Sequence, residues 1–177
     1  VQEAIDNKLA YVTEDRKGNG LILSKSIKMN TTLANMSGII NGKVIDTDKE
    51  YAVAEEYRKK LKTKCPTVEQ NVGNLSGGNQ QKVLLAKWMF AEPDILILDE
   101  PTRGIDVGAK YEIYCIINDL VAAGKSVIMI SSELPEVLGM SDRIYIMNEG
   151  RFVGEVSGEE ATSELIMSRI VKSGKGE

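Results

Sequence analysis

The chain has no histidine among its 177 residues, and it has only two cysteines, Cys65 and Cys115. Without histidine, catalysis by a Ser-His-Asp or Cys-His arrangement is excluded. The cysteines form no C-x-x-C pair, so the pattern argues against a zinc site as well. We interpret them as two reduced thiols, with Cys115 packed in the core among the apolar residues of a helix.

Long apolar runs and an excess of positive charge are also missing. No stretch approaches the roughly 18 apolar residues that a membrane-spanning helix needs, and no secretory signal opens the chain. The net charge of −4 gives no electrostatic footprint for nucleic acid, so no nucleic-acid partner is expected. The hydrophobic content of 42% supports a real core, in one domain or in one domain with a subdomain.

A phosphate-binding loop is the third absence. No segment matches G-x-x-x-x-G-K-[ST]. The run Gly124-Lys125-Ser126 lacks the upstream glycine and leads into a strand rather than a helix. The chain begins with Val1 instead of Met, so we expect a processed chain or a piece of a longer one.

What the chain does contain is an apolar run that ends in two acids. Residues 95–98 are typical of a short strand buried on both faces of a parallel sheet. Asp99 and Glu100 follow, and Pro101 ends the strand because it cannot extend the ladder. Ligands of open α/β sheets bind at this carboxyl end, where one carboxylate can hold Mg²⁺ and a second can orient or deprotonate water. Taken alone, the pattern also fits an ordinary strand end with solvated acids.

Two glycines, Gly77 and Gly78, stand before a helical run at residues 80–90. Ser76 or Asn79 can cap that helix, and its free N–H groups and positive end then suit an anion such as phosphate. A glycine turn that enters an ordinary helix is the alternative for such a segment by itself. Here the helix leads directly into the strand with the acid pair, and the combination is far more specific.

Together these segments resemble the ATP-binding domains of ABC transporters. The similar motifs are the signature motif Leu75-Ser76-Gly77-Gly78-Asn79-Gln80-Gln81, the Walker B strand at residues 95–100 and the D-loop Gly104-Ile105-Asp106. The variants Asn79-Gln80-Gln81-Lys82-Val83 and Glu100-Pro101-Thr102-Arg103-Gly104 are similar to the C-terminal ATPase domain of monosaccharide importers of the ribose, galactose, xylose or arabinose type. The resemblance covers about residues 11–156, and it implies a chain truncated after the Walker A region.

The resemblance implies an α/β fold, namely a partial P-loop NTPase core with parallel strands plus a helical subdomain. Residues 1–22 would be part of the ATP-binding core with the Q-loop region. Residues 23–90 would be the helical subdomain with the signature motif. Residues 91–177 would return to the ATP-binding core, with Walker B, the D-loop and a C-terminal hairpin and helix.

The resemblance also gives the motif residues their roles. Asp99 is implied as the ligand of Mg²⁺ and Glu100 as the catalytic residue that polarises the attacking water. The implied nucleotide-binding residues are Ser76, Gly77, Gly78, Asn79, Gln80, Asp106, Glu14 and Ser132. The expected ligands are therefore ATP and Mg²⁺, with the γ-phosphate belonging to a nucleotide held by a second ATPase domain.

Two of these positions depart from the general ABC pattern. Glu14 stands where the Q-loop glutamine is expected, and a carboxylate cannot donate as an amide can. Ser132 stands where the switch histidine is expected, and a hydroxyl cannot replace an imidazole. We therefore expect a slow or non-standard half-site. The neighbouring charges at residues 15–17 are interpreted as a solvated loop.

Hydrophobic periodicity and turn residues predict the remaining elements. Helices are expected at 2–8, 107–123, 135–139 and 157–171, and strands at 9–13 and 127–130, with a hairpin formed by 143–147 and 151–156. Asp106 is expected to cap the helix that Gly124 ends. Residues 21–66 should carry helical pieces rather than strands, with Thr47 to Glu50 as a capping box. Residues 172–177 should fray.

The resemblance implies a fragment of the ATP-hydrolysing subunit that powers import of a monosaccharide, peripheral on the cytoplasmic face of the inner or plasma membrane. The implied partners are a second ATPase domain, the permease subunits through the helical subdomain (with Met29, Leu33 and Met36 as candidates) and, indirectly, a sugar-binding protein. Without the phosphate loop, the isolated chain should bind ATP weakly and hydrolyse it negligibly. Two alternatives stay open: a non-catalytic module that completes a partner's ATPase site, and an ABC ATPase of a non-transport system.

Overall fold

The computed structural model describes residues 1–173. Its contacts divide the chain into two compact units, Val1–Ile130 and Ser131–Glu177, and each unit is described by itself. This boundary differs from the predicted ranges 1–22, 23–90 and 91–177, which follow the order of the motifs and stay a prediction.

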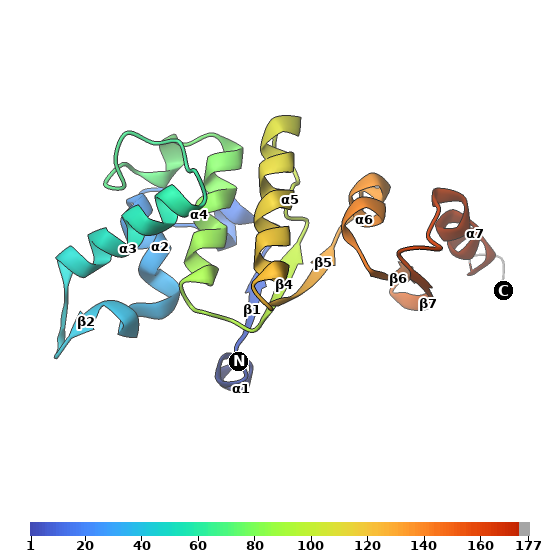
Figure 1. The fold of residues 1–177 in the computed structure, drawn as a ribbon, viewed down its shortest axis with the longest axis horizontal. Coiled ribbons are helices and arrows are strands. Elements are labelled where there is room, and N and C mark those ends of the chain that lie inside the picture. The colour runs from blue at the N-terminus through green and yellow to red at the C-terminus, as the bar shows by residue number, and fades with distance from the viewer. Residues whose placement is uncertain (174–177) are drawn as a thin grey trace. The chain divides into compact units, whose positions relative to one another are not determined.

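The first unit is built on a three-stranded parallel sheet with the order β1–β4–β5 (Figure 1). The strands are β1 (Leu9–Val12), β4 (Ile95–Asp99) and β5 (Ser126–Ile130). On the central strand β4, Leu96 and Leu98 are fully buried. The predicted parallel strands at 9–13, 95–98 and 127–130 are therefore confirmed, since apolar runs of this length fit a sheet that is covered by helices.

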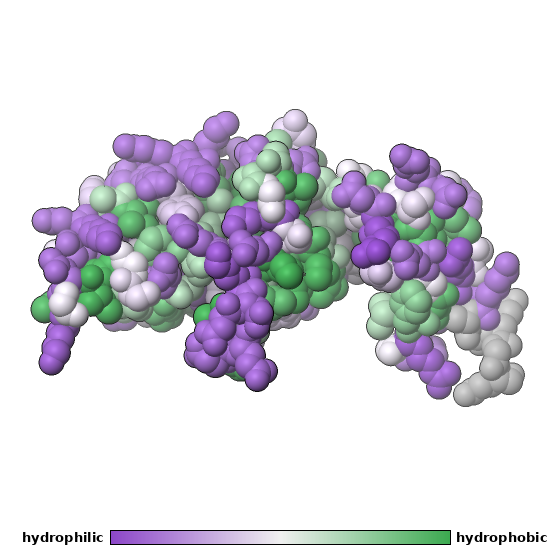
Figure 2. Space-filling view, turned by 60° about the horizontal axis from the view of Figure 1, so that its bottom comes forward, coloured by the Kyte–Doolittle hydropathy of each residue, from purple (hydrophilic) through white to green (hydrophobic). Residues whose placement is uncertain are grey.

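One face of this sheet is less buried than the sequence predicts. On β5, the side chains of Ile128 and Ile130 are 52% and 46% exposed, and Ile97 on β4 is only half-buried. The prediction of strands buried on both faces is thus wrong, because an apolar run does not reveal on which side covering elements lie. Hydrophobic areas lie among hydrophilic ones on the face of the chain drawn in Figure 2.

Two helices of the first unit pack on the sheet and on each other. Helix α4 (Gly77–Met89) contacts β1, helix α5 (Val107–Ala122) contacts β5, and the two helices lie side by side (Figure 1). The N-cap prediction for α5 is confirmed, because Asp106 accepts a hydrogen bond from the Ala109 N–H at 2.9 Å. Gly124 follows the helix with a φ of +84°, the left-handed backbone that suits glycine after a helix.

The prediction that Cys115 lies in the core is wrong. Its side chain is exposed, although it sits in the apolar middle of α5. The buried face of that helix is formed by Ile113, Ile116, Ile117 and Leu120. Cys115 lies outside this face, since buried positions recur at three and four residues along a helix.

Residues 21–75 form a region in which several short elements surround one longer helix, α3. They are α2 (Ile27–Thr32), the 3₁₀ segment η2 (Leu33–Ile39), β2 (Ile40–Asn41), β3 (Val44–Ile45), α3 (Thr47–Lys60) and the 3₁₀ turn η3 (Val72–Asn74). The antiparallel hairpin β2–β3 contradicts the prediction that this region contains no strands. Strands of two residues leave no periodicity to detect.

The structure corrects the predicted cap of α3 and the predicted loop at residues 15–17. The cap of α3 is Asp46, which accepts from the Lys49 N–H at 3.0 Å, so the predicted capping box is misplaced by one residue. The segment that contains the predicted solvated loop at 15–17 forms a π-helical turn, η1 (Arg16–Gly20), in which Asp15 accepts from the Gly18 N–H. The predicted helix at 2–8 is confirmed as the short α1 (Gln2–Asp6).

The second unit consists of α6 (Leu134–Met140), an antiparallel hairpin of β6 (Arg143–Asn148) and β7 (Arg151–Ser157), and α7 (Ser163–Ser173). The predicted hairpin is confirmed, with Glu149 and Gly150 both at positive φ in its turn, as a two-residue hairpin loop requires. Four buried side chains form its core: Ile144, Ile146, Val156 and Ile166.

The last helix begins later than predicted. The hydroxyl of Thr162 accepts from the Leu165 N–H at 3.1 Å, whereas Ser157 and Glu160 hydrogen-bond to each other within a preceding turn. Of the residues expected to fray, Lys172 lies in α7, and residues 174–177 lie outside the described part. Within that part, no helix is long and apolar enough to cross a membrane.

Candidate functional site

The acid pair lies at the carboxyl end of the central strand. Asp99 is the last residue of β4, and the Glu100 N–H donates to the carbonyl of Ile130 on β5 at 2.9 Å. Glu100 has a φ of +46°, a left-handed conformation that costs energy for a residue with a side chain. Both residues are only half-buried, so the structure places two adjacent carboxylates at the rim of the sheet.

Tyr11 approaches this acid pair from the neighbouring strand. Its hydroxyl donates to Oδ2 of Asp99 at 2.5 Å, and this hydrogen bond raises the pKa of Tyr11. Sequence reasoning missed this residue. The available signal was the parallel pairing of β1 with β4, because the carboxyl ends of neighbouring parallel strands meet at one edge.

The signature segment forms the first turn of α4. Ser76 occupies the N-cap position, but its side chain makes no capping hydrogen bond. Instead its Oγ accepts from Nδ2 of Asn79 at 3.0 Å, while Oδ1 of Asn79 accepts from the Lys64 N–H at 2.8 Å. The predicted cap position is therefore right and the predicted side-chain cap is not. The first-turn N–H groups are left to other acceptors, which suits an anion.

The two glycines of this segment lie in close contacts that leave no room for a Cβ at Gly78 and little room at Gly77. A Cβ on Gly78 would lie 2.5 Å from Cβ of Ala109 on α5, and a Cβ on Gly77 would lie 3.0 Å from Nη2 of Arg16 and 3.3 Å from the carbonyl oxygen of Gly104. The start of α4 is thus pressed against α5 and the D-loop. This contact brings the signature and D-loop motifs together within one chain.

Gln80 and Lys82 point inward and hold the segment in place. The Gln80 side chain, 4% exposed, donates to the carbonyl of Leu75 at 3.2 Å. Nζ of Lys82 lies 2.8 Å from Oε2 of Glu112 and 3.1 Å from the carbonyl oxygen of Lys62. A structural role is visible for both, and the nucleotide-binding role of Gln80 stays a prediction.

The segment that carries Glu14 is joined to the D-loop by side chains. Glu14 forms an ion pair with the guanidinium of Arg103. The guanidinium of Arg16 donates to the carbonyl oxygens of Arg103 at 2.7 Å and of Gly104 at 3.3 Å. The interpretation of residues 15–17 as a solvated loop is therefore wrong for Arg16, and burial lowers the pKa of its guanidinium. Nothing in the sequence signalled a contact to backbone carbonyls so far along the chain.

Asp106 and Ser132 complete the predicted set. Asp106 is exposed and caps α5, two residues after the D-loop glycine Gly104. Ser132 is exposed and belongs to the second unit, and its role in place of a switch histidine stays a prediction. The structure therefore brings together three segments in the first unit, residues 14–16, 76–79 and 103–106.

The residues present allow a hard cation but do not form a closed metal site. Among residues 1–173, no group of three or more Cys, Asp or Glu side chains could hold a metal ion by itself. Mg²⁺ in phosphoryl-transfer sites is held by one or two carboxylates together with phosphates and water. Asp99 can supply one such carboxylate. Oδ2 of Asp99 accepts from Tyr11, and the carboxylate keeps further lone pairs for a cation.

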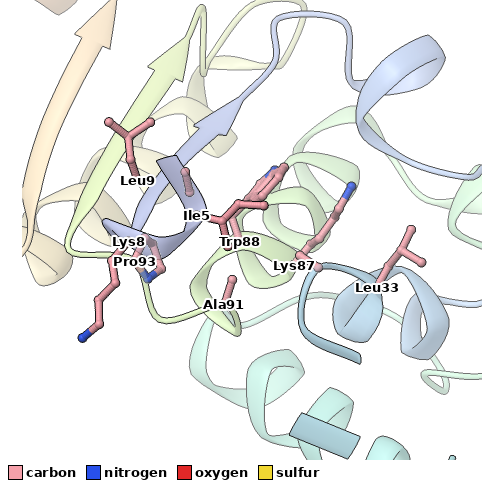
Figure 3. Close-up of a pocket in the computed structure, with 10 residues that line it drawn as sticks. Ile5, Lys8, Leu9, Leu33, Lys87, Trp88, Ala91 and Pro93 are labelled. Carbon is pink, nitrogen blue, oxygen red and sulfur yellow. The ribbon is translucent and has the colours of Figure 1, made fainter. Parts of the chain in front are cut away.

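A separate hollow lies at the opposite end of β1. It measures about 300 Å³ and is lined by Ile5, Leu9, Leu33, Lys87, Trp88 and their neighbours (Figure 3). None of the predicted site residues lines it. The predicted site residues lie instead at the carboxyl end of β4 and at the start of α4.

The parallel sheet, the acid pair at its rim and the glycine-led helix define an α/β nucleoside-triphosphatase core. A family model described as ABC transporter matches residues 2–103, which is more than half of the chain, and the chain belongs to that family. The predicted family and the predicted fold class are both confirmed.

Three curated relatives show where within the family the chain falls. It is 62% identical over 173 residues to the L-arabinose transport ATP-binding protein AraG of Geobacillus stearothermophilus, covering 98% of this chain and 34% of the relative. It is 57% identical to the xylose import ATP-binding protein XylG of Geobacillus kaustophilus, covering 94% and 33%. It is 54% identical to the ribose import ATP-binding protein RbsA of Clostridium tetani, covering 96% and 34%. The chain thus spans about a third of the length of these relatives.

Solved structures share the fold at low identity. An ATP-binding cassette of an ABC transporter in its ADP conformation superposes with a TM-score of 0.72 at 19% identity, covering 99% of this chain and 71% of that chain. A dimeric cassette in a post-hydrolysis state, bound to ADP and Pi, gives a TM-score of 0.70 at 22% identity, covering 85% and 62%. These likenesses show the fold alone.

Proposed function

We propose that the chain is the part of a monosaccharide importer's ATP-hydrolysing subunit that carries the signature motif, Walker B and the D-loop. The observation that carries this proposal is the acid pair at the rim of the sheet in the same compact unit as the glycine-led start of α4. The names of the relatives, which are transport proteins for arabinose, xylose and ribose, support the sugar class. They also favour transport over the alternative of an ABC ATPase in a non-transport system.

Asp99 and Glu100 divide the chemistry between them. Asp99 would hold Mg²⁺, which supplies charge neutralisation for the phosphates when it is bound. Glu100 polarises the attacking water by accepting its proton. The strained backbone of Glu100 supports this role, because such strain persists where the surrounding structure fixes a residue for function.

The start of α4 binds the terminal phosphate. Ser76, Gly77 and Gly78 present a hydroxyl and backbone N–H groups at the positive end of the helix, and Asn79 holds the Ser76 hydroxyl in place. Phosphoryl transfer asks the protein mainly for placement and charge compensation. The nucleotide itself is held by a second ATPase domain, so this surface works across an interface, with Asp106 at the joint.

The other partners follow from the same proposal. The permease subunits would contact residues 23–90, where Met29 is 39% exposed and Leu33 and Met36 are half-buried. A sugar-binding protein would act indirectly, and the chain would be peripheral on the cytoplasmic face of the membrane. Glu14 and Ser132, which replace a glutamine and a histidine, would make the half-site slow or non-standard.

The decisive test is Glu100→Gln in the intact ATP-binding protein that carries this segment. Loss of the base should abolish steady-state ATP turnover while ATP stays bound, because the amide keeps the shape of the side chain and cannot accept a proton. Turnover is measured by phosphate release and binding by retained nucleotide. A Glu100→Gln protein that hydrolyses ATP at the wild-type rate would exclude the assignment.

The absent G-x-x-x-x-G-K-[ST] motif favours a second description of residues 1–177 taken alone. By themselves they should bind ATP weakly, hydrolyse it negligibly and serve as a module that completes a partner's site. Adding the isolated chain to an ATPase domain that contains the missing loop, and measuring turnover, tests this. Stimulation supports the module, and tight ATP binding by the chain alone would refute it.

A further inference from the structure

Three segments that are far apart in the sequence meet at Gly77. The position of a Cβ on Gly77 lies 3.0 Å from Nη2 of Arg16, 3.3 Å from the carbonyl oxygen of Gly104 and 3.4 Å from Cγ2 of Ile105. The first turn of α4 therefore rests on the D-loop, and the guanidinium of Arg16 lies where these two surfaces meet. A shift of any one of these groups is felt by the other two, since no spare volume separates them.

Arg16 is bound at this point by its planar fork. Its Nη1 donates to the carbonyl of Arg103 at 2.7 Å and its Nη2 to the carbonyl of Gly104 at 3.3 Å. Its Nε is buried and has no hydrogen-bond partner among the described residues. A lysine carries its three donors on one rotatable ammonium, so it lacks the fixed planar fork that matches two consecutive carbonyls.

A second link joins the same two segments. Glu14, two residues before Arg16, forms an ion pair with the guanidinium of Arg103, whose own carbonyl oxygen accepts from Arg16. The segment 14–16 is thus fixed to the D-loop by a side-chain pair and by a side-chain-to-backbone fork. Burial lowers the pKa of Arg16, while the charge of the neighbouring Asp15 raises it.

We propose that Arg16 is a positioning residue, whose guanidinium holds the carbonyls of Arg103 and of Gly104, the first D-loop residue, against the first turn of α4 at Gly77. Through this contact the segment of Glu14, the D-loop and the signature turn keep a fixed spacing. This inference rests on the proposed function, because that spacing sets where the signature donors and Asp106 meet a partner's nucleotide. Arg16 does not touch the reacting atoms itself.

The test compares Arg16→Gln, Arg16→Lys and the control Lys17→Gln in the intact ATP-binding protein. Lys17 is the exposed neighbour of Arg16 in η1. Arg16→Gln should lower kcat for ATP hydrolysis by about ten- to a hundredfold, which is the cost of a misplacement of about 1 Å, while KM for ATP changes by less than about threefold. Arg16→Lys should regain only part of the rate, and Lys17→Gln should match the wild type.

A second readout separates positioning from general damage. Rates are expressed per nucleotide-binding site, counted by titration, so that unfolded protein does not lower them. Arg16→Gln and Arg103→Gln should be non-additive when combined, because both release residues 14–16 from the segment at Arg103 and Gly104. If Arg16→Gln does not fold, the rate of Arg16→Lys decides the case.

Different outcomes would contradict the positioning role of Arg16 and the proposed function. Wild-type kcat in Arg16→Lys and Arg16→Gln, or additive effects of Arg16→Gln and Arg103→Gln, would overturn the positioning role. The same holds if Lys17→Gln loses as much activity as Arg16→Gln. An intact wild-type protein without any ATPase activity would instead count against the proposed function.

Discussion

At the scale of single residues, the contact between Tyr11 and Asp99 makes the site sensitive to pH. The hydrogen bond to Asp99 raises the pKa of Tyr11 above its ordinary value of 10.0. A group whose folded pKa is raised contributes stability below its unfolded pKa, and that contribution is lost as the pH rises through the folded value. The hydrogen bond should therefore be intact at neutral pH and weaken as the pH rises through the raised pKa of Tyr11.

Asp99→Asn should move the pKa of Tyr11 back towards 10.0, because the amide carries no charge and accepts a weaker hydrogen bond. The measurement is an NMR titration of the tyrosine rings, in which Tyr11→Phe identifies the signal. Tyr57 serves as an internal control, since burial raises its pKa to about 12 independently of Asp99. An unchanged pKa of Tyr11 in Asp99→Asn would show that the contact does not exist in solution.

At the scale of elements, Lys82 connects α4 with two neighbours. Its Nζ lies 2.8 Å from Oε2 of Glu112 on α5 and 3.1 Å from the carbonyl oxygen of Lys62 after α3. The Lys82 side chain is 2% exposed, whereas that of Glu112 is 44% exposed. Loss of the partner should therefore cost Lys82 more free energy than it costs Glu112. A buried ammonium without a counter-charge stays desolvated, whereas a half-exposed carboxylate can be hydrated by water.

Glu112→Gln should lower the free energy of unfolding by about 1–3 kcal/mol, since it leaves a buried charge without its charged partner. Lys82→Met should cost less, because methionine fills a similar volume without a charge. Urea denaturation at neutral pH measures both. Lys82 also lowers the pKa of Glu112, so this stabilisation is present above the unfolded carboxyl pKa of about 4.3 and is lost as the pH falls through the folded value. A gap between wild type and Glu112→Gln that persists in acid would contradict this account.

The elements that could be predicted from the sequence are those whose pattern is local. The apolar runs of β1, β4 and β5 predicted the parallel sheet, and Asp106 and Gly124 predicted both ends of α5. The hairpin β2–β3 could not be predicted, because each strand has two residues. The N-cap of α3 is Asp46 rather than the predicted Thr47. Both residues can cap a helix, and the pattern alone does not fix a helix end to one residue.

At the scale of the whole molecule, the candidate site also contains residues that the sequence predicted and residues that it did not. Asp99, Glu100 and the glycines were predicted because the chemistry of a strand end and of a helix start is written in neighbouring residues. Tyr11 and Arg16 were missed, because each acts on a group 87 or 88 positions away in the sequence. Only the folded sheet brings those groups together, and in the case of Arg16 the partners are backbone carbonyls that carry no sequence signal.

The half-exposed face of β5 leads to a prediction for the isolated chain. Ile128 and Ile130 are 52% and 46% exposed on one face of a parallel strand, although parallel sheets are normally covered on both faces. Two isoleucines side by side on an edge strand favour association with a second copy. Residues 1–177 alone should therefore sediment as a mixture whose mean mass rises with concentration.

Ile128→Lys should shift that mixture towards the monomer, because a charge on this face must be desolvated in a dimer. Val121→Lys is the matched control, since Val121 is 48% exposed on α5 and lies outside the sheet. Sedimentation velocity at several concentrations compares the wild-type chain with both variants. If Val121→Lys dissociates the chain as strongly as Ile128→Lys, added charge alone is responsible and the β5 face is not the contact. If the wild-type chain is monomeric at every concentration, the exposed β5 face does not cause association and the prediction is wrong.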